Sequence, residues 1–431
     1  MFFEYFSTII FFVAILHVLF SNYFLKFAHR LKSKRHKHNV AFSTYSFLGN
    51  AALIFGLWLI PILIVMTIQK GAGDTYGFLA GIDLIEPFAY FVLIAIATTR
   101  PIRYFFDTVM QKICRLFKNR LLFFWIALLL FSSILGGIFS EIAIMTLVCY
   151  ELSASFFPLR PSTKLTYFTF ALLLLGISVG TTILPFNFSF FLQQLGGNWN
   201  NWQVFSEFGW KALFALLCLC VLVGYLFRSE FRKLQKEFSK GKPKGRVSFR
   251  EIFYVLLFFI ASVGKGNVYL LLMVIGLVIV MHRPKHRMKG EEGKLSLYFP
   301  LIIAFFTYTL EIHAGLQKWW VVPLFENAGG ISSFGLAYLL TGLNEHVPIE
   351  ALKTTLKNGT SATQFFSYLG VLAGGGLTII AKSANIVAKL KLREHFPHQA
   401  ISPILHILLA IPLGLLLSAI ITLLHFLGAP A

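Results

Sequence analysis

The sequence predicts an all-α polytopic membrane protein with about 11–13 transmembrane or re-entrant helices, arranged as two inverted-topology repeats with broken helices. Of its 431 residues, 57% are hydrophobic and only 13% are charged, and the mean hydropathy is +0.74. Apolar runs of about twenty residues recur, and each is long enough to cross a hydrocarbon core of about 30 Å. Glycines and single charges interrupt several of these runs, which predicts helices that break inside the membrane.

The positive charge of the chain is arranged as in membrane proteins. The formal net charge is +20, and most of the 38 Lys and Arg residues fall in five segments between the apolar runs: 30–37, 100–120, 228–250, 283–294 and 389–393. This is the positive-inside pattern of cytoplasmic loops. The predicted partner is therefore the lipid bilayer, with no binding of nucleic acid expected, and assembly into homo-oligomers is left open.

The predicted spans follow from the apolar runs between these loops. Two runs are broken: residues 121–157 by a glycine pair followed by Glu141, and residues 252–281 by the sequence GKGN. Both have basic flanks on each side, which predicts hairpins that return to the cytoplasmic side. The other expected spans are residues 2–26, 45–68, 84–99, 165–187, 212–227, 296–314 and 402–427.

The same pattern predicts the domain organisation. We expect N-terminal transmembrane helices in residues 1–120, a first transporter repeat with a hairpin in 121–227, a basic cytoplasmic linker in 228–250, connecting transmembrane helices in 251–314, a second transporter repeat with a hairpin in 315–393, and a C-terminal transmembrane helix in 394–431.

Two segments share an order of features that predicts an internal repeat. The first has GGIFSE, ending at Glu141, and then GTTI, which contains Thr182; the second has TGLNE, ending at Glu345, and then GLTI, which contains Thr378. The first unit follows a basic loop and the second leads into one, so the two should cross the membrane in opposite senses. Inverted repeats with broken helices mark the substrate site of many secondary transporters.

The stretch from residue 370 to residue 389, GVLAGGGLTIIAKSANIVAK, is expected to be a broken helix that lines the substrate path. Three consecutive glycines weaken a helix by roughly 1 kcal/mol each relative to alanine. Lys382 then lies in an apolar environment, where three interpretations are open. It could take the place of a sodium ion by pairing with Glu345 or Glu141, it could bind an anionic substrate, or it could extend to the membrane interface.

Candidate ion- and proton-binding residues come from both repeats. Carboxyl groups desolvated in membrane helices can bind and release protons, and they can coordinate a cation. Neutral hydroxyl and amide oxygens suit a hard cation, although they serve equally often in packing. The predicted set is Glu141, Glu345, Thr182, Thr378, Asn385, Ser383, Lys382, Asn344 and Ser178.

The chain offers little sign of enzyme chemistry. It contains no nucleophile elbow, Walker loop, zincin motif or dinucleotide fingerprint, and its four cysteines form no CxxC pair. We therefore expect no enzymatic activity, no cofactor and no resident metal.

Several segments resemble the putative sodium/proton antiporter family of the ion-transporter superfamily: FLGNAALIFGLW, ATTRPI, FGWKA, GLQKWWVVPL, LTGLNEH and GGGLTIIAKSAN. The resemblance implies a two-repeat transporter with paired hairpins that exchanges a cation, sodium, for protons in the bacterial inner membrane. This chain is a divergent member. Glu345 keeps a carboxylate where the family pattern has Asp, whereas Lys382 replaces an Asn and the acidic residues near Asn50 are lost.

Three functions are therefore weighed. The first is a secondary active transporter that performs cation (sodium)/proton antiport by alternating access, with Glu141 and Glu345 exposed to each side in turn. The alternative on the same scaffold is an anion or small-organic-acid transporter, which Lys382 and the lost acidic residues favour. The third is a membrane scaffold that transports nothing.

Overall fold

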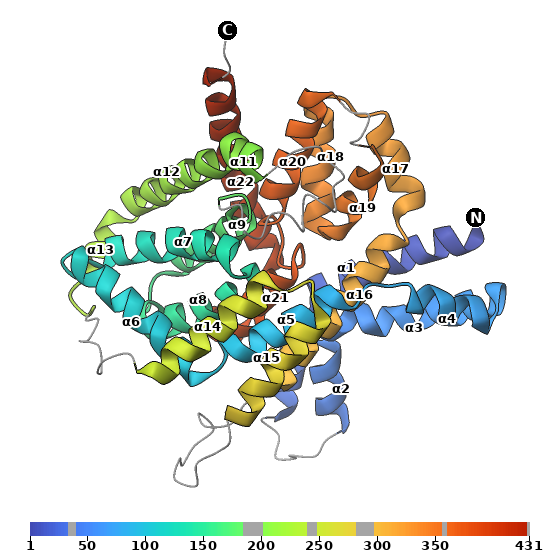
Figure 1. Ribbon diagram of the computed structural model, residues 1–431, viewed down its shortest axis with the longest axis horizontal. Helices are drawn as coiled ribbons and strands as arrows, with labels where there is room; N and C mark the ends of the chain where they lie inside the picture. The colour runs from blue at the N-terminus through green and yellow to red at the C-terminus, as the bar shows by residue number, and fades with distance from the viewer. Residues whose placement is uncertain (33–39, 184–200, 239–247, 282–296, 356–359, 429–431) are drawn as a thin grey trace.

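The computed structural model describes the chain except residues 33–39, 184–200, 239–247, 282–296, 356–359 and 429–431 (Figure 1). The regular elements in the described residues are all helices. Within these described residues, seven helices are long and apolar enough to cross a membrane, and up to nine spans result if two bent helix pairs each count as one. The protein is therefore a multi-pass membrane protein. The expected all-α polytopic class with broken helices is confirmed. The expected number of about 11–13 helices included re-entrant helices as well as spans.

The N-terminal third forms one side of the molecule. The first helices of this part pack together. Pro61 lies inside the helix Ala51–Lys70, which is tolerated where neighbouring helices support a span. The basic segment 100–120 forms an amphipathic helix that begins directly after Thr99. The elements are α1 (Phe2–Lys32), α2 (Val40–Leu48), α3 (Ala51–Lys70), α4 (Ala72–Ala80), α5 (Ile85–Ala97) and α6 (Arg100–Leu116), with a bend of 51° between α4 and α5.

The middle of the chain contains both predicted broken hairpins. The first consists of α7 (Leu121–Ile138) and α8 (Glu141–Ser155), and the second consists of α14 (Phe249–Val263) and α15 (Val268–Met281), with the GKGN sequence at the turn. Between them lie α9 (Thr163–Gly180), α11 (Asn201–Val204), α12 (Trp210–Leu226) and α13 (Arg228–Leu234). The end of the span expected at 165–187 and part of the linker expected at 228–250 lie outside the described residues.

The C-terminal third contains the second predicted repeat. Its elements are α16 (Tyr298–Gly315), α17 (Lys318–Glu326), α18 (Ile331–Leu343), α19 (His346–Thr355), α20 (Ser361–Gly374), α21 (Ser383–Leu392) and α22 (Pro403–Leu427). A bend of 63° separates α16 from α17. The stretch from 370 to 389 is a broken helix, as expected, because α20 ends at Gly374 and α21 begins only at Ser383.

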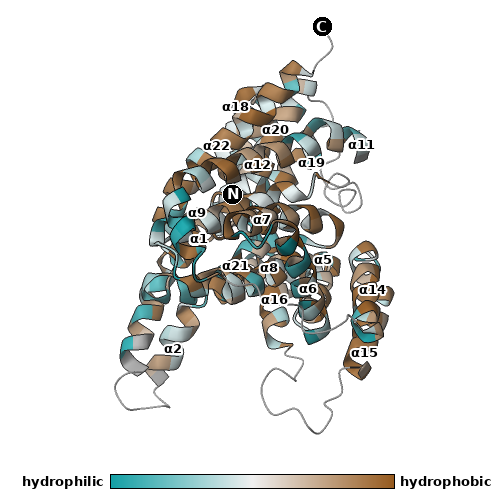
Figure 2. Ribbon diagram, turned by 90° about the vertical axis from the view of Figure 1, so that its left-hand side faces the viewer, coloured by the Kyte–Doolittle hydropathy of each residue, from teal (hydrophilic) through white to brown (hydrophobic). Residues whose placement is uncertain are grey.

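Apolar side chains cover the outer faces of the helices. Figure 2 shows hydrophobic residues over much of α18, α20 and α22 and more hydrophilic residues on α6. On α22, Ile404, Leu408 and Leu423 are exposed, which is what a lipid-facing surface requires. The interior is organised around α8 and α21, which pack against each other near the middle of the molecule (Figure 1). α5 packs on α8 and α16 packs on α21, so α8 and α21 are enclosed by other helices.

The two repeats share a backbone feature at their hairpins. Ser140 lies between α7 and α8 with φ −172° and ψ 132°, and Asn344 lies between α18 and α19 with φ −172° and ψ 121°. In both cases two residues separate the helices, and the extended residue directly precedes the carboxylate. This agreement supports the predicted correspondence of the two units.

The helices after the two hairpins meet in opposite directions. The backbone of Gly376 lies against Leu175, where an added Cβ would be 2.8 Å from the Leu175 Cα, while further along α9 the hydroxyl of Ser178 donates to the carbonyl of Leu372 at 2.8 Å. Moving forward along α9 therefore means moving backward along α20. Such antiparallel contact agrees with units of inverted orientation, although the boundaries expected for the domains remain predictions.

Candidate ion- and proton-binding site

The site is built where the broken helices meet. Glycines end α20, and the close approach of Gly376 to the Leu175 backbone leaves no space for a side chain there. The chain then runs without regular helix to Lys382, which has φ −135° and ψ 154° and is the N-cap residue of α21. The break therefore places a lysine side chain in the protein interior, away from the basic loop that follows α21.

Lys382 bridges two carboxylates that come from the two different repeats. Its Nζ lies 2.9 Å from Oε2 of Glu141 and 2.9 Å from Oε2 of Glu345. The exposed fractions are 4% for Lys382, 9% for Glu141 and 5% for Glu345. Glu141 is the first residue of α8, and Glu345 directly precedes α19 and donates its backbone N–H to the carbonyl of Ala381 at 2.9 Å. We call Glu141, Lys382 and Glu345 the central triad.

The charges of the central triad do not balance. Two carboxylates and one ammonium leave a net charge of −1 when all three groups are ionised. The amino ends of α8, α19 and α21 all point to this region, and helix amino ends favour carboxylates there. An uncompensated buried charge is nevertheless costly. The triad is therefore suited to take up one further positive charge, either a proton or a monovalent cation.

Asn385 holds the broken segment in place. Its Nδ2 donates to the carbonyl oxygens of Gly375 and Thr378, both at 2.8 Å. Its Oδ1 is buried and has no hydrogen-bond partner in the described structure. The hydroxyl of Thr378 donates to the carbonyl of Gly342 in α18, so it links the break to the second hairpin. Asn385 thus combines a structural role with one free acceptor oxygen.

The other candidate side chains bind the backbone or each other. Asn344 donates from Nδ2 to the Leu310 carbonyl at 2.9 Å and accepts from the N–H of His346 at 2.9 Å. The hydroxyls of Ser383 and Thr307 lie 2.8 Å apart. These groups fix the unwound segments around the central triad.

Two candidates from the first repeat form hydrogen bonds to backbone carbonyls. The hydroxyl of Ser178 binds the Leu372 carbonyl, so it joins α9 to α20. The hydroxyl of Thr182 donates to the Val179 carbonyl at 2.7 Å, within its own turn. The structure thus brings together Glu141, Glu345 and Lys382 directly, surrounds them with the residues of the second break, and gives Thr182 a bond to its own backbone.

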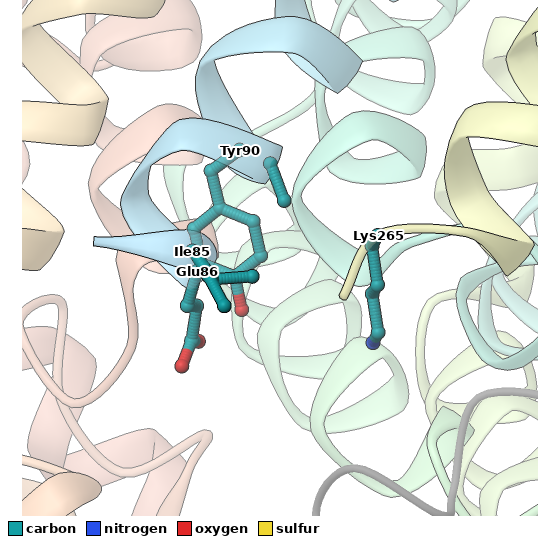
Figure 3. A pocket seen from close by; sticks show the side chains of 5 residues that line it. Ile85, Glu86, Tyr90 and Lys265 are labelled. Carbon is teal, nitrogen blue, oxygen red and sulfur yellow. The ribbon is translucent and has the colours of Figure 1, made fainter. Parts of the chain in front are cut away.

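A second group of ionisable residues lies beside the central triad and was not among the predicted site residues. Glu86 and Tyr90 of α5 and Lys265 of the turn between α14 and α15 line a small cavity (Figure 3). Lys265 interacts electrostatically with Glu86 and Glu141. The sequence signal was present, because Lys265 lies in a glycine-broken apolar hairpin, just as Lys382 follows a glycine run.

Comparison with known proteins assigns the chain to a family. The family model described as "Putative Na+/H+ antiporter" matches residues 2–425. No curated protein sequence matches the chain significantly. Since the family model covers nearly the whole chain, the match includes both hairpins and the central triad. The resemblance seen in the sequence is therefore confirmed: this multi-pass membrane protein belongs to the family described as "Putative Na+/H+ antiporter".

Proposed function

We propose that the protein is a secondary active transporter that exchanges sodium, or a similar monovalent cation, for protons by alternating access in the bacterial inner membrane. The observation that carries this proposal is the central triad, in which two buried carboxylates share one ammonium. The net charge of −1 can be compensated by one proton or by one cation. Binding of either therefore disfavours binding of the other, which is the competition that antiport requires.

Lys382 gives the triad a resident positive charge. In the proton-loaded state, one carboxyl is protonated and Lys382 pairs with the other. In the cation-loaded state, the proton is gone and the cation shares the two carboxylates with Lys382, with Asn385 Oδ1 as a neutral acceptor close to the break. Because the triad joins both repeats, a movement of one repeat against the other can expose the same charges to each side in turn.

The decisive test is transport by purified protein in proteoliposomes. We expect an inward gradient of at least one of the cations Na+, Li+ and K+ to drive protons outward. The pH inside the proteoliposomes should then rise. Glu141→Gln and Glu345→Gln should each abolish it, because each removes a charge for which proton and cation compete. Glu326→Gln, on an exposed residue at the end of α17, should not. Absence of a pH change with every cation in the unmodified protein would reject antiport.

Transport of an anion or small organic acid is the second candidate, and Lys382 together with the amino ends of three helices favours it. The substitution Lys382→Asn separates the two candidates. Loss of organic-acid uptake in that variant would support anion transport. A stronger dependence on sodium would support cation/proton antiport, since the carboxylates would then need the cation more.

A further inference from the structure

The hairpin formed by α14 and α15 places a lysine inside the membrane. α14 has 15 residues and α15 has 14. At 1.5 Å per residue, each helix is about 22 Å long and is too short to cross a hydrocarbon core of about 30 Å. The sequence on both sides of the hairpin is basic, as in cytoplasmic loops. Lys265, at the turn, therefore reaches beyond the middle of the membrane toward the outer side.

α5 gives an independent measure of the same depth. It has 13 residues and ends shortly before the basic helix α6, so Glu86 lies about 20 Å from the cytoplasmic boundary. On its other side, Glu86 is preceded by the exposed residue Asp83, whose carboxylate accepts the backbone N–H of Ile85 at 2.8 Å. Glu86 and Lys265 therefore lie at a similar level in the outer half of the membrane, about one helical turn from the exposed residue Asp83.

The cavity between these residues can hold water. Its lining consists of Ile85, Glu86, Ala89 and Tyr90 from α5 and of Lys265. Its volume of about 20 Å³ is enough for one water molecule, which needs at least about 10–15 Å³ and polar partners. Figure 3 shows Lys265 across the cavity from Glu86 and Tyr90. A carboxylate, a phenol and an ammonium supply those partners.

Tyr90 connects the cavity to the central triad. Its side chain lies beside Glu86 in the cavity lining and within electrostatic range of Glu141 and Glu345. Lys265 interacts with Glu86, Glu141 and Lys382. α5, which carries Glu86 and Tyr90, is in direct contact with α8, which begins with Glu141. The ionisable groups that face one another here are thus Glu86, Tyr90, Lys265 and the three residues of the central triad.

We propose that this cavity is the outer proton port of the central triad. A proton taken up by Glu86 from the outer side moves to the cavity water or to the Tyr90 oxygen, while that group releases its own proton toward Glu141. Each transfer breaks one O–H bond and forms another, so no oxidant or co-reactant is needed. Lys265 stabilises the carboxylate of Glu86 after the proton has left. This inference rests on the proposed function, since it assigns the proton path of that same site.

The first test separates proton transfer from cation binding. Glu86→Gln removes the carboxylate that takes up the proton from the outer side. We expect the rate of cation-driven proton movement to fall at least about 10-fold, since proton transfer by a positioned side chain contributes about 10²–10⁴-fold. The cation KM should stay unchanged, because Glu86 is not part of the triad. Glu86→Asp should recover part of the rate. A Glu86→Gln variant with the rate and pH profile of the unmodified protein would overturn the proposal.

The second test does not depend on transport. In a chain whose four native cysteines are replaced by serine, Ile85→Cys should react with a membrane-impermeant, negatively charged methanethiosulfonate added from the outer side. The matched control is Leu256→Cys, which is 51% exposed on the surface of α14 where lipid is expected. It should not react, because a charged reagent does not enter lipid. Reaction of Ile85→Cys only from the cytoplasmic side, or none, would contradict an outer port.

The two proposals can fail separately. If Ile85→Cys reacts from the outer side but no cation drives a pH change, the wet port stands and cation/proton antiport is rejected. If antiport is measured while Ile85→Cys stays unreactive and Glu86→Gln keeps its rate, antiport stands and the port is rejected.

Discussion

Replacing Lys382 by asparagine removes the positive charge that two buried carboxylates share. The lysine Nζ lies 2.9 Å from each carboxylate. At an effective dielectric constant of about 20, each contact has a gross Coulomb energy of about 6 kcal/mol, most of which offsets the desolvation of the charges. Breaking a buried ion pair by removing one partner has a net cost of about 3–5 kcal/mol. We expect the free energy of unfolding of Lys382→Asn to fall by that amount at neutral pH without metal cations.

The loss should be reversible by the species that the triad is proposed to bind. Adding Na+ supplies the missing charge, and a cation that binds only the folded protein at 100 times its Kd recovers about 2.7 kcal/mol. Lowering the pH should also recover stability, because protonation of Glu141 or Glu345 relieves the repulsion between the two carboxylates. The measurement is denaturant unfolding of the purified protein in detergent, in choline, Na+, Li+ or K+ at constant ionic strength and at several pH values.

Lys389→Met provides the matched control. Lys389 is also buried in α21, but its Nζ donates to the hydroxyl of Ser21 at 3.0 Å and contacts no carboxylate in the described structure. Its replacement by an apolar residue should leave the cation dependence of unfolding unchanged. The reasoning fails if Lys382→Asn loses less than about 1 kcal/mol, or if its loss is the same in every cation and at every pH.

Three further substitutions test other parts of the site. Glu345→Gln should weaken the dependence of unfolding on Na+, because it removes one of the two carboxylates proposed to bind the cation. The measurement is denaturant unfolding at increasing Na+ concentration. An unchanged response to Na+ would show that Glu345 is not part of the cation site. Gly376→Ala should cost about 1–3 kcal/mol of unfolding free energy by overpacking against the Leu175 backbone. The control is Gly335→Ala in α18, where an added Cβ meets no atom within 4 Å, so this substitution should be neutral or stabilising by up to about 1 kcal/mol. Equal effects of the two substitutions in thermal unfolding would argue against the close approach of Gly376 to Leu175. Asn385→Ala leaves two buried carbonyls without their donor and should cost about 1–3 kcal/mol for each, with faster hydrogen exchange in the broken segment; unchanged exchange would show that Asn385 does not hold the break.

Local features of the sequence predicted the fold class and the places where helices break. Membrane spans depend on the length of apolar runs, and the orientation of loops depends on their charge, so both can be read without tertiary contacts. The break after Gly374 follows from consecutive glycines, whose helix propensity is low wherever they occur. The acidic hairpins were visible for the same reason, since a carboxylate shortly after a glycine is unusual in an apolar run.

The sequence did not determine the contacts between distant segments. Three roles for Lys382 were open in the sequence. Only the tertiary structure shows that its ammonium lies between Glu141 and Glu345. Glu141 is 241 positions away from Lys382 along the chain. The same holds for Lys265 and Glu86, which line one cavity because the hairpin of α14 and α15 packs against α5.

The physical reason is that an ion pair depends on side-chain direction and on the packing of helices that are remote in sequence, and neither leaves a local pattern. The sequence by itself determined that this chain is a broken-helix membrane protein with buried charges. The tertiary structure decided which of those charges face each other, and hence the net charge of −1 at the central triad on which the proposed exchange depends.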